Sequence, residues 1–562
     1  MNFKEEIAKF VGVNADLIAE SPKPEMGDFC LPCFTFAKEQ KKSPIIIASE
    51  LKVKLENNLP EFIEKLEVMA GYLNFFLNKT FAGKIVLDSC NKPSPYQEIG
   101  KGKKMCIEYC SPNLAKYMHI GHFANLVTGE SLQRIYAFLG FDITKICYVG
   151  DYGTPFGKMV VAIQKWGDLE KVKEKGVDEI QNLYIEFAKK EVEDESLIEE
   201  ARKASKMIED KVGEPYELYK MIREIAIKEC QRIVTLMNVT FDDWRGESYY
   251  SSAMKDVIKE LQDKDVAKVG DNGAIIVDLE EYGAHVAVIQ RADGGSVYIT
   301  RDLCAVDDRY NLYKFDKMLY VVGLEQSNHF KQLFKILELM GKPYAKNLQH
   351  ISYGLFSMKE GKISSRKGKQ ALFADLYAEG VDAAQNVVKD KEFAIEDKNE
   401  FVKKVARSAL AFSVLKVERN KDKIFDKDKM ISFEGETAPY VQYTYARCCS
   451  LERKFAEFGV KHNLNLKPCE NDEIFANNFT LIKALYASQN SVLDAYTKGE
   501  PYFIARALLD ICQEFNKFYH NTKILDDSNP SIAPELMEIV VAVKACLAEL
   551  MPLVLIDMVE EM

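Results

Sequence analysis

The segment SPNLAKYMHIGH (residues 111–122) places two of the chain's seven histidines three positions apart, with a glycine between them. The apolar run before it, KMCIEYC (104–110), predicts a buried strand, and a helical pattern resumes after His119. We therefore predict a strand, a Ser-Pro-Asn turn and a helix that begins near Gly121. The first turn of such a helix offers unpaired N–H groups and the positive end of the helix dipole, which favour a bound phosphate. His119 and His122 can add ring N–H donors, and Gly121 leaves space for a flat adenine beside the backbone.

The alternative is that the two imidazoles only satisfy polar groups in a buried turn. With 7 histidines and 30 glycines in 562 residues, the pattern H-x-G-H arises by chance in roughly one chain in two hundred. A phosphate-binding helix start is therefore favoured over an accident of composition.

Further apolar runs indicate an α/β sheet. CYVGDYG (147–153) and KMLYVVG (317–323) predict buried strands, and helical stretches lie between them. GAIIVDLEE, HVAVIQRADG and SVYITR form a β-rich stretch over 273–301, whereas glycine is scarce and the period is helical from about 390 onwards. Strands that alternate with helices predict a parallel sheet with insertions, followed by an all-helical domain.

Composition limits the function classes. The net charge of −11 argues against indiscriminate nucleic-acid binding, although an acidic protein can carry a local basic groove. Cys30 and Cys33 form a CxxC pair without a second pair, so we expect no metal site. Thirteen scattered cysteines, no secretion signal and no apolar run of about 18 residues predict a cytoplasmic protein that does not enter a membrane. With no apolar patch that demands a partner, we expect a monomer.

Three other segments carry candidate chemistry. GKISSRKGK (361–369) is a basic, glycine-flanked loop that would be solvated surface if it had no ligand. In YITRDLCA, Tyr298 and Asp302 lie four apart and share one face of a helix. A phenol and a carboxylate suit a guanidinium, although an ordinary exposed helix face would look the same.

The third segment, ETAPYVQYTYARCCSLERK (436–454), places Tyr440, Tyr443 and Arg447 on one helical face. Aromatic rings beside an arginine suit stacking on splayed RNA bases. The alternative is an aromatic stripe that packs in a core, which is the more frequent outcome without other information.

The pattern SPN-x-AK-x-x-H-x-G-H resembles the signature of the arginyl-tRNA synthetases, a family of class I aminoacyl-tRNA synthetases, and the basic loop resembles their KMSKS loop. The resemblance implies a role in ATP binding for the histidines, the glycine and two loop serines: His119, Gly121, His122, Ser364 and Ser365. It implies a catalytic role, through charge at the phosphates, for Lys116, His119, His122, Lys362 and Arg366. The chain departs from the family at Tyr117, where proline is usual, and at Ala124, where arginine is frequent. The second lysine of the general class I loop signature is replaced by Ser365, a substitution that arginyl enzymes commonly show. Lys116 is the best candidate to replace that lost charge.

The same resemblance implies an arginine pocket and a tRNA interface. The residues predicted to bind arginine are Glu108 and Asp302 with Tyr298 at the guanidinium, and Asn113 and Gln326 at the α-ammonium. Tyr440, Tyr443 and Arg447 are predicted to contact the tRNA. The implied reaction activates L-arginine with ATP, accompanied by Mg²⁺ as part of the co-substrate, and transfers it to tRNA(Arg).

The resemblance implies an α/β multidomain fold with a Rossmann-type parallel-sheet catalytic domain, an α+β N-terminal domain and an all-α anticodon-binding domain. The predicted N-terminal domain, which contacts the tRNA elbow, is 1–100, and the predicted catalytic domain is 101–370. The catalytic domain contains a helical insertion at about 156–236 and a β-rich insertion at about 250–295. A connecting segment, 371–390, leads to the anticodon-binding domain, 391–562.

Two other functions stay open on the sequence. A cysteinyl enzyme of the same class would need a zinc cluster, and a glutamyl enzyme would need a cationic pocket where this chain has Glu108 and Asp302. A tRNA-binding protein that has lost catalysis would not be expected to keep both histidines and the basic loop.

Overall fold

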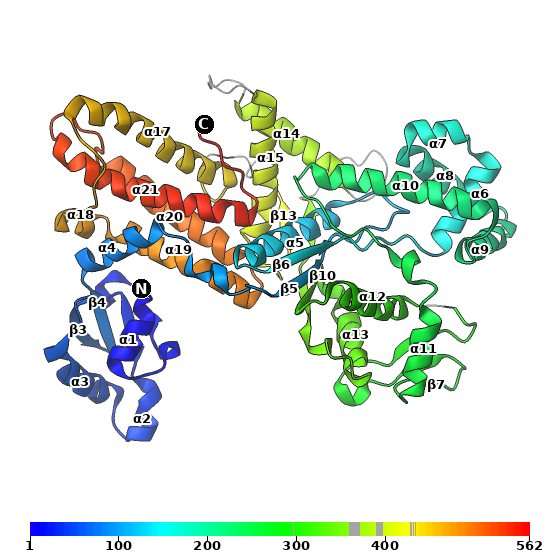
Figure 1. The fold of residues 1–562 in the computed structure, drawn as a ribbon, viewed down its shortest axis with the longest axis horizontal. Helices are drawn as coiled ribbons and strands as arrows, with labels where there is room; N and C mark the ends of the chain where they lie inside the picture. Colours follow the sequence, from blue (N-terminus) through cyan, green and yellow to red (C-terminus); the bar gives the residue numbers. More distant parts are fainter. Residues whose placement is uncertain (296, 359–370, 389–396, 427–429, 431, 433) are drawn as a thin grey trace.

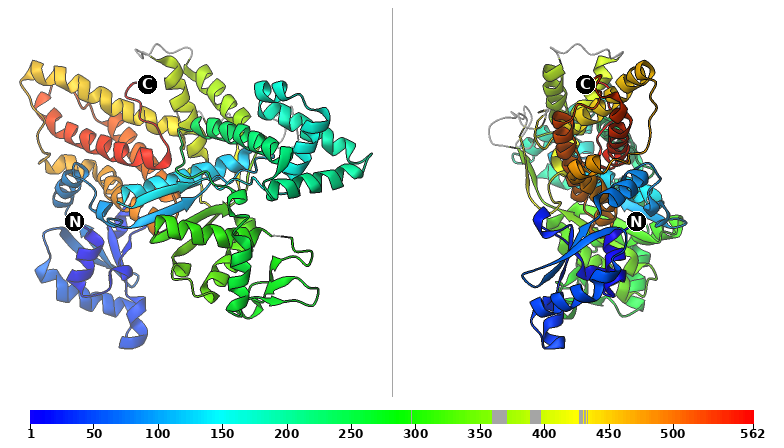
Figure 2. Two further views of the ribbon diagram at one scale, coloured as in Figure 1. Left: turned by 45° about the vertical axis from the view of Figure 1, so that its right-hand side comes forward. Right: turned by 90° about the vertical axis from the view of Figure 1, so that its left-hand side faces the viewer.

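The computed structural model describes residues 1–295, 297–358, 371–388, 397–426, 430, 432 and 434–562. Lobes surround a central parallel sheet (Figure 1). The N-terminal lobe lies beside the C-terminal helices, and two inserted lobes extend from the other side of the sheet. The view turned by 45° shows the same separation of lobes (Figure 2, left).

The N-terminal lobe is an antiparallel sheet with helices, in agreement with the predicted α+β domain. Its sheet has the order β1-β2-β4-β3, formed by β1 (Ala19–Glu20), β2 (Phe29–Pro32), β3 (Ile63–Met69) and β4 (Tyr72–Leu77). Its helices are α1 (Phe3–Val11), α2 (Phe34–Gln40) and α3 (Pro44–Leu55), and α4 (Lys79–Cys90) leads out of the lobe to pack on C-terminal helices. Cys30 and Cys33 are buried, reduced residues of this lobe.

The central sheet is parallel and has the order β11-β10-β5-β6. Its strands are β5 (Lys104–Glu108), β6 (Asp142–Ile146), β10 (Lys317–Gly323) and β11 (Leu348–Tyr353), with α5 (Ile120–Phe138) after β5 and α13 (Ser327–Leu339) after β10. The chain runs outward in opposite directions from β5 and from β10. In such sheets a ligand binds outside the carboxyl ends of the two strands where the order reverses. The predicted strand at 317–323 is confirmed, and the predicted strand at 104–110 is confirmed as far as Glu108.

Two details of the strand prediction are wrong. Residues 147–153 are not a strand, because β6 ends at Ile146, which pairs with Glu108 at the end of β5. Beyond that pair the neighbouring strand offers no further ladder, and only Gly150 bridges to Asn113. Residues 298–301 begin a helix instead of a strand, since Ile299 is followed by buried residues at helical spacing, Leu303 and Val306.

Both insertions leave this sheet on its carboxyl side. The first is the predicted helical one, formed by α6 (Thr154–Trp166), α7 (Leu169–Lys175), α8 (Val177–Lys190), α9 (Ser196–Glu209) and α10 (Gly213–Thr235). The second contains α11 (Met254–Asp263), the antiparallel strands β7 (Lys268–Val269), β8 (Ile275–Val277) and β9 (Ala287–Gln290), and then α12 (Tyr298–Tyr313), which packs on α13.

The remaining described segments are almost entirely helical. A short parallel pair, β12 (Phe356–Met358) with β13 (Lys423–Phe425), accompanies α14 (Phe373–Val388) and α15 (Lys398–Leu415). The C-terminal helices are α17 (Ala438–His462), α18 (Asp472–Asn477), α19 (Phe479–Lys498), α20 (Tyr502–Asn521) and α21 (Ala533–Leu550), followed by the 3-10 helix η10 (Met551–Val554).

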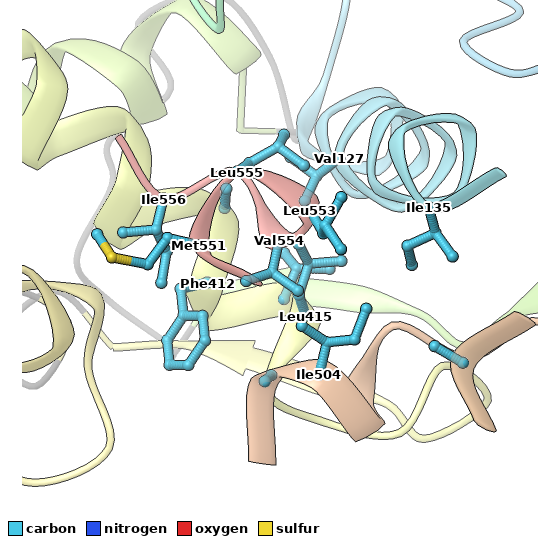
Figure 3. Packing of buried hydrophobic residues seen from close by; sticks show 14 of the residues in the cluster. Val127, Ile135, Phe412, Leu415, Ile504, Met551, Leu553, Val554, Leu555 and Ile556 are labelled. Atoms are coloured by element: carbon cyan, nitrogen blue, oxygen red, sulfur yellow. The ribbon is translucent and has the colours of Figure 1, made fainter. Parts of the chain in front are cut away.

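The end of the chain packs against the helix of the central sheet that begins at the histidines. Leu553–Ile556 fill the space between α5, α15 and α20, and Figure 3 shows them among Val127, Ile135, Phe412 and Ile504. Ser131 of α5 donates a hydrogen bond to the carbonyl of Leu553 at 2.6 Å. The two segments therefore share one hydrophobic core.

Candidate active site

The turn after β5 is held by one asparagine of α5. Cys110 has a φ of 60°, in the left-handed region that non-glycine residues seldom adopt. The side chain of Asn125 accepts the N–H of Cys110 and donates to the carbonyl of Val321 on β10 at 2.6 Å. These contacts join the turn, the helix and the neighbouring strand into one unit.

The two histidines cap the start of α5 with their ring nitrogens. Nδ1 of His119 accepts the N–H of Gly121 at 3.1 Å, and Nδ1 of His122 accepts the N–H of His119 at 3.0 Å. The ring centroids are 4.0 Å apart. Since each Nδ1 accepts a hydrogen bond, the proton of each neutral ring resides on Nε2. The sequence predicts histidines that donate to phosphate, and this geometry leaves Nε2–H as that donor.

The surroundings keep both rings neutral. Burial lowers the pKa of His119, and the charge of Lys116 lowers it further. Burial and the neighbouring His119 lower the pKa of His122 to about 3. Near neutral pH the two rings can therefore donate hydrogen bonds without carrying charge.

The low pKa of His122 predicts a specific loss of stability in acid. Below its ordinary pKa of 6.5 the unfolded chain binds a proton that the folded chain does not bind, so stability falls with pH between 6.5 and about 3. We expect the drop in unfolding free energy from pH 7 to pH 5.5 to be smaller by about 1 kcal/mol in His122→Asn, which keeps an acceptor without a titrating ring. Urea unfolding at the two pH values measures this, with the exposed His285→Asn as the control. An equal drop in His122→Asn and in the unmodified protein would contradict it.

A cavity of 670 Å³ lies beside the capped helix start. His119, Gly121 and His122 line it from one side, and Gly323 and Gln326, which follow β10, line it from the other. The segments that flank the basic loop also reach it, through Ser357 and Ala371, and the carbonyl of Ala371 accepts the N–H of Ile120 at 3.1 Å. The predicted loop residues themselves, Lys362, Ser364, Ser365 and Arg366, lie outside the described residues.

Lys116 is exposed and lines a different cavity, of 540 Å³, together with Tyr117 and Asp178. The structure therefore does not place its side chain in the cavity of the histidines, although its charge acts on His119. The hydroxyl of Tyr117 donates to Asp178 of α8 at 2.6 Å, so this departure from the family pattern ties the turn to the helical insertion. Ala124, the other departure, packs in the core.

The first predicted arginine-binding acid already has a basic partner within the chain. Glu108, the last residue of β5, is 4% exposed and lies 2.5 Å from the guanidinium of Arg309. Burial raises the pKa of Glu108, and the charge of Arg309 opposes that rise. Nε and Nη2 of Arg309 have no hydrogen-bond partner among the described residues, so Glu108 is the acid that holds this buried cation.

The second predicted acid, Asp302, accepts a hydrogen bond from Nε2 of His329 on α13 at 2.6 Å. Tyr298, one turn earlier on α12, is 68% exposed, and its ring lies 4.8 Å from the guanidinium of Arg301. Arg301 in turn pairs with Glu247 at 3.0 Å. Burial raises the pKa of Glu247 to about 7, although Arg301 opposes the shift.

Arg309, His329 and Glu247 were not predicted from the sequence. His329 stands in VGLEQSNHF, three residues after Gln326. The segment from which Gln326 was predicted therefore also contained His329. The two predicted residues for the α-ammonium are exposed, and of these Gln326 lines the cavity of the histidines. Asn113 instead accepts the N–H of Ala115 at 2.9 Å within the turn.

The predicted tRNA-contacting residues form a half-buried cluster between α17 and α20. The guanidinium of Arg447 donates to Asn516 at 2.5 Å and lies between the rings of Tyr443 and Tyr519, at 4.6 and 4.2 Å. Asn516 also donates to the hydroxyl of Tyr440 at 2.8 Å. The side chains of Tyr440, Tyr443 and Arg447 are therefore partly buried and held by contacts within the chain.

The described residues contain neither a metal-ligand cluster nor a membrane-spanning helix. No group of three or more His, Cys, Asp or Glu there could hold a metal ion. Across those residues, no helix has both the length and the apolar character needed to cross a bilayer.

The reversal of strand order beside a histidine-capped helix is the arrangement of a class I aminoacyl-tRNA synthetase. Comparison with known families agrees, since the family described as tRNA synthetases class I (R), catalytic domain, matches residues 87–427. The arginyl tRNA synthetase N terminal domain matches residues 1–77, and the DALR anticodon binding domain matches 441–562.

Comparison with individual proteins identifies the family within this class. The chain is 39% identical to an arginine–tRNA ligase of Halothermothrix orenii over 91% of this chain and 89% of that protein. It is 36% identical to one of Clostridium perfringens over the full length of both. The fold matches the solved arginyl-tRNA synthetase of Thermus thermophilus with a TM-score of 0.80 at 23% identity, covering 100% of this chain and 99% of that one. The chain belongs to the arginyl-tRNA synthetase family.

Proposed function

We propose that the chain attaches L-arginine to its cognate tRNA with ATP, through an arginyl-adenylate intermediate. The supporting observation is that the proposed arginine-binding acids and the proposed phosphate-binding helix start lie at the same end of β5. Glu108 ends β5 beside Asp302, and the turn that follows leads directly to the histidine-capped start of α5. A cationic amino acid and a nucleotide phosphate can therefore meet at the carboxyl edge of β5 and β10.

In the proposed reaction the arginine carboxylate attacks the α-phosphorus of ATP in line, and pyrophosphate leaves. Nε2–H of His119 and His122 and the N–H groups at the start of α5 stabilise the charge that develops on the phosphate oxygens. Lys116, Lys362 and Arg366 supply positive charge, and Gly121, Ser364 and Ser365 contact ATP. Positioning and electrostatics supply most of the rate enhancement, as in other phosphoryl transfers. The adenylate then passes its arginyl group to the 3′-terminal ribose of the tRNA.

In the proposed arginine pocket, acidic side chains bind the guanidinium of arginine and amide side chains bind its α-ammonium. Asp302, Glu108 and Tyr298 bind the guanidinium, and Asn113 and Gln326 bind the α-ammonium. A rival amino acid without the cation would give Asp302 no guanidinium to bind, which is a basis for rejection. Mg²⁺ enters with ATP, whose phosphate oxygens are ligands that this ion prefers.

The tRNA contacts are proposed at both ends of the chain. The N-terminal domain, 1–100, contacts the elbow of the tRNA. The C-terminal domain, 391–562, contacts the anticodon through Tyr440, Tyr443 and Arg447, whose planar groups can stack on bases. We further propose a cytoplasmic monomer, in which 371–390 connects this domain to the catalytic domain, 101–370.

Amino-acid-dependent exchange of pyrophosphate into ATP tests this function when tRNA is present. We expect exchange with arginine and none with glutamate or cysteine. Exchange that depends on another amino acid would reject the arginine pocket. Silence with every amino acid, together with retained tRNA binding, would indicate a protein that binds tRNA without catalysis.

A further inference from the structure

Asp302 has a titratable partner within the chain. Its carboxylate lies 2.6 Å from Nε2 of His329, and both side chains are mostly buried, with 22% and 24% exposed. An imidazole at this distance is a second candidate cation for the carboxylate that is proposed to bind the substrate guanidinium.

The other acids around this carboxylate are paired with arginines. Glu108 pairs with Arg309, and Glu247 pairs with Arg301. A guanidinium stays charged at every physiological pH, whereas an imidazole can lose its proton. Of these three internal bases, His329 is therefore the one whose charge can be removed when another cation arrives.

We propose that His329 is a positioning residue for Asp302 that is protonated in the empty pocket and releases its proton when arginine binds. This inference rests on the proposed role of Asp302. After release, the neutral ring still donates Nε2–H to one oxygen of Asp302, and the guanidinium takes the charge of the carboxylate. Before arginine binds, the charge of Asp302 is thus balanced by the protonated His329, which pairs with it more weakly than the substrate guanidinium does.

The neighbouring groups favour a protonated His329. Burial lowers the pKa of His329, but the hydrogen bond and charge of Asp302 and the charge of Glu108 outweigh it, so the pKa lies above 6.5. A second imidazole, His350 on β11, has a lowered pKa because it is buried, and it does not replace His329 as the cation. The charged and titratable groups around the pair include Arg301 and Arg309 on α12, Glu108 on β5, Tyr148 after β6, Tyr320 on β10, Glu247 in the 3-10 helix Glu247–Tyr250, Glu325 in the 3-10 helix Leu324–Gln326, and His350.

Two consequences can be measured. Arginine binding at pH 6.5 releases more than about half a proton from His329, because the ring is more than half protonated there. Arginine affinity also falls with decreasing pH, by up to about tenfold per pH unit below the pKa of His329.

Isothermal titration calorimetry of the full-length protein with arginine, in two buffers of different ionisation enthalpy, measures the released protons. We expect His329→Gln, which keeps a neutral donor, to release fewer protons than the unmodified protein by about half a proton or more at pH 6.5. Glu247 has a pKa of about 7 and is a second proton source, so the difference between the two proteins is the readout. Glu247→Gln should retain the His329 contribution, and His285→Gln controls for the loss of an exposed imidazole.

Equal proton release by His329→Gln and the unmodified protein would overturn the inference, and so would the absence of release from the unmodified protein, which needs no variant. Asp302→Asn separates this failure from failure of the pocket. If that variant keeps full arginine affinity, the proposed role of Asp302 is wrong. If it loses affinity while His329→Gln releases protons normally, only the role of His329 is wrong.

Discussion

Asp302→Asn is expected to raise the KM for arginine by about 30- to 150-fold in tRNA-dependent pyrophosphate exchange, because a charge-assisted hydrogen bond contributes about 2–3 kcal/mol. The amide keeps the size of the side chain but loses the negative charge. It also presents N–H groups to a guanidinium that has only donors. The KM for ATP should change little, since the histidine-capped helix start that is proposed to bind ATP is built from other residues.

Asp307→Asn is the matched control for this variant. Asp307 lies on the same helix, its side chain is 23% exposed against 22% for Asp302, and it pairs with Lys342 at 2.8 Å. The Asp307→Asn substitution removes a similar ion pair, which is not part of the proposed arginine pocket. Equal losses of arginine and ATP affinity in Asp302→Asn would indicate general damage to the fold and would count against the pocket.

Lys116→Ala is expected to slow adenylate formation by at least about 30-fold, equivalent to about 2 kcal/mol in the barrier. The reason is the missing second lysine of the basic loop, where Ser365 stands, which leaves the triphosphate short of one positive charge. Lys116 is exposed, three residues before His119, and its charge already acts on that ring.

The measurement is the rate of pyrophosphate exchange at saturating arginine and tRNA. Lys116→Arg keeps the charge and should recover most of the rate. A near-normal rate in Lys116→Ala would reject the assignment, and it would leave the cavity shared with Tyr117 and Asp178 as the place where this side chain acts.

Local sequence was sufficient to predict the strand, turn and helix start that form the proposed phosphate-binding half of the site. A buried strand, a proline turn and a helix start lie within residues 104–122, so their arrangement depends on short-range geometry. The sequence did not reveal that the histidines cap the helix through Nδ1, because that depends on ring orientation. The strand at 147–153 was mispredicted for a related reason, since a strand ends where its neighbour ends and not where its apolar run ends.

The proposed arginine-binding half depends on tertiary contacts that no local pattern contains. Asp302 and Glu108 were predicted from the family resemblance, but their internal partners come from distant positions. His329 reaches Asp302 because α12 packs on α13, and Arg309 reaches Glu108 across just over two hundred residues of chain. The electrostatic state of each acid therefore follows from topology, which sequence periodicity cannot supply.

The family match for the catalytic domain ends at residue 427, yet the interior of that domain is completed by residues beyond 550. A fragment cut at the family boundary would leave Val127 and Ile135 of α5 facing water and would remove the carbonyl acceptors of Ser131 and Arg134. The segments that match the catalytic and anticodon-binding families are thus separate in the sequence but share one hydrophobic core. We therefore expect the two segments to unfold together rather than as independent units.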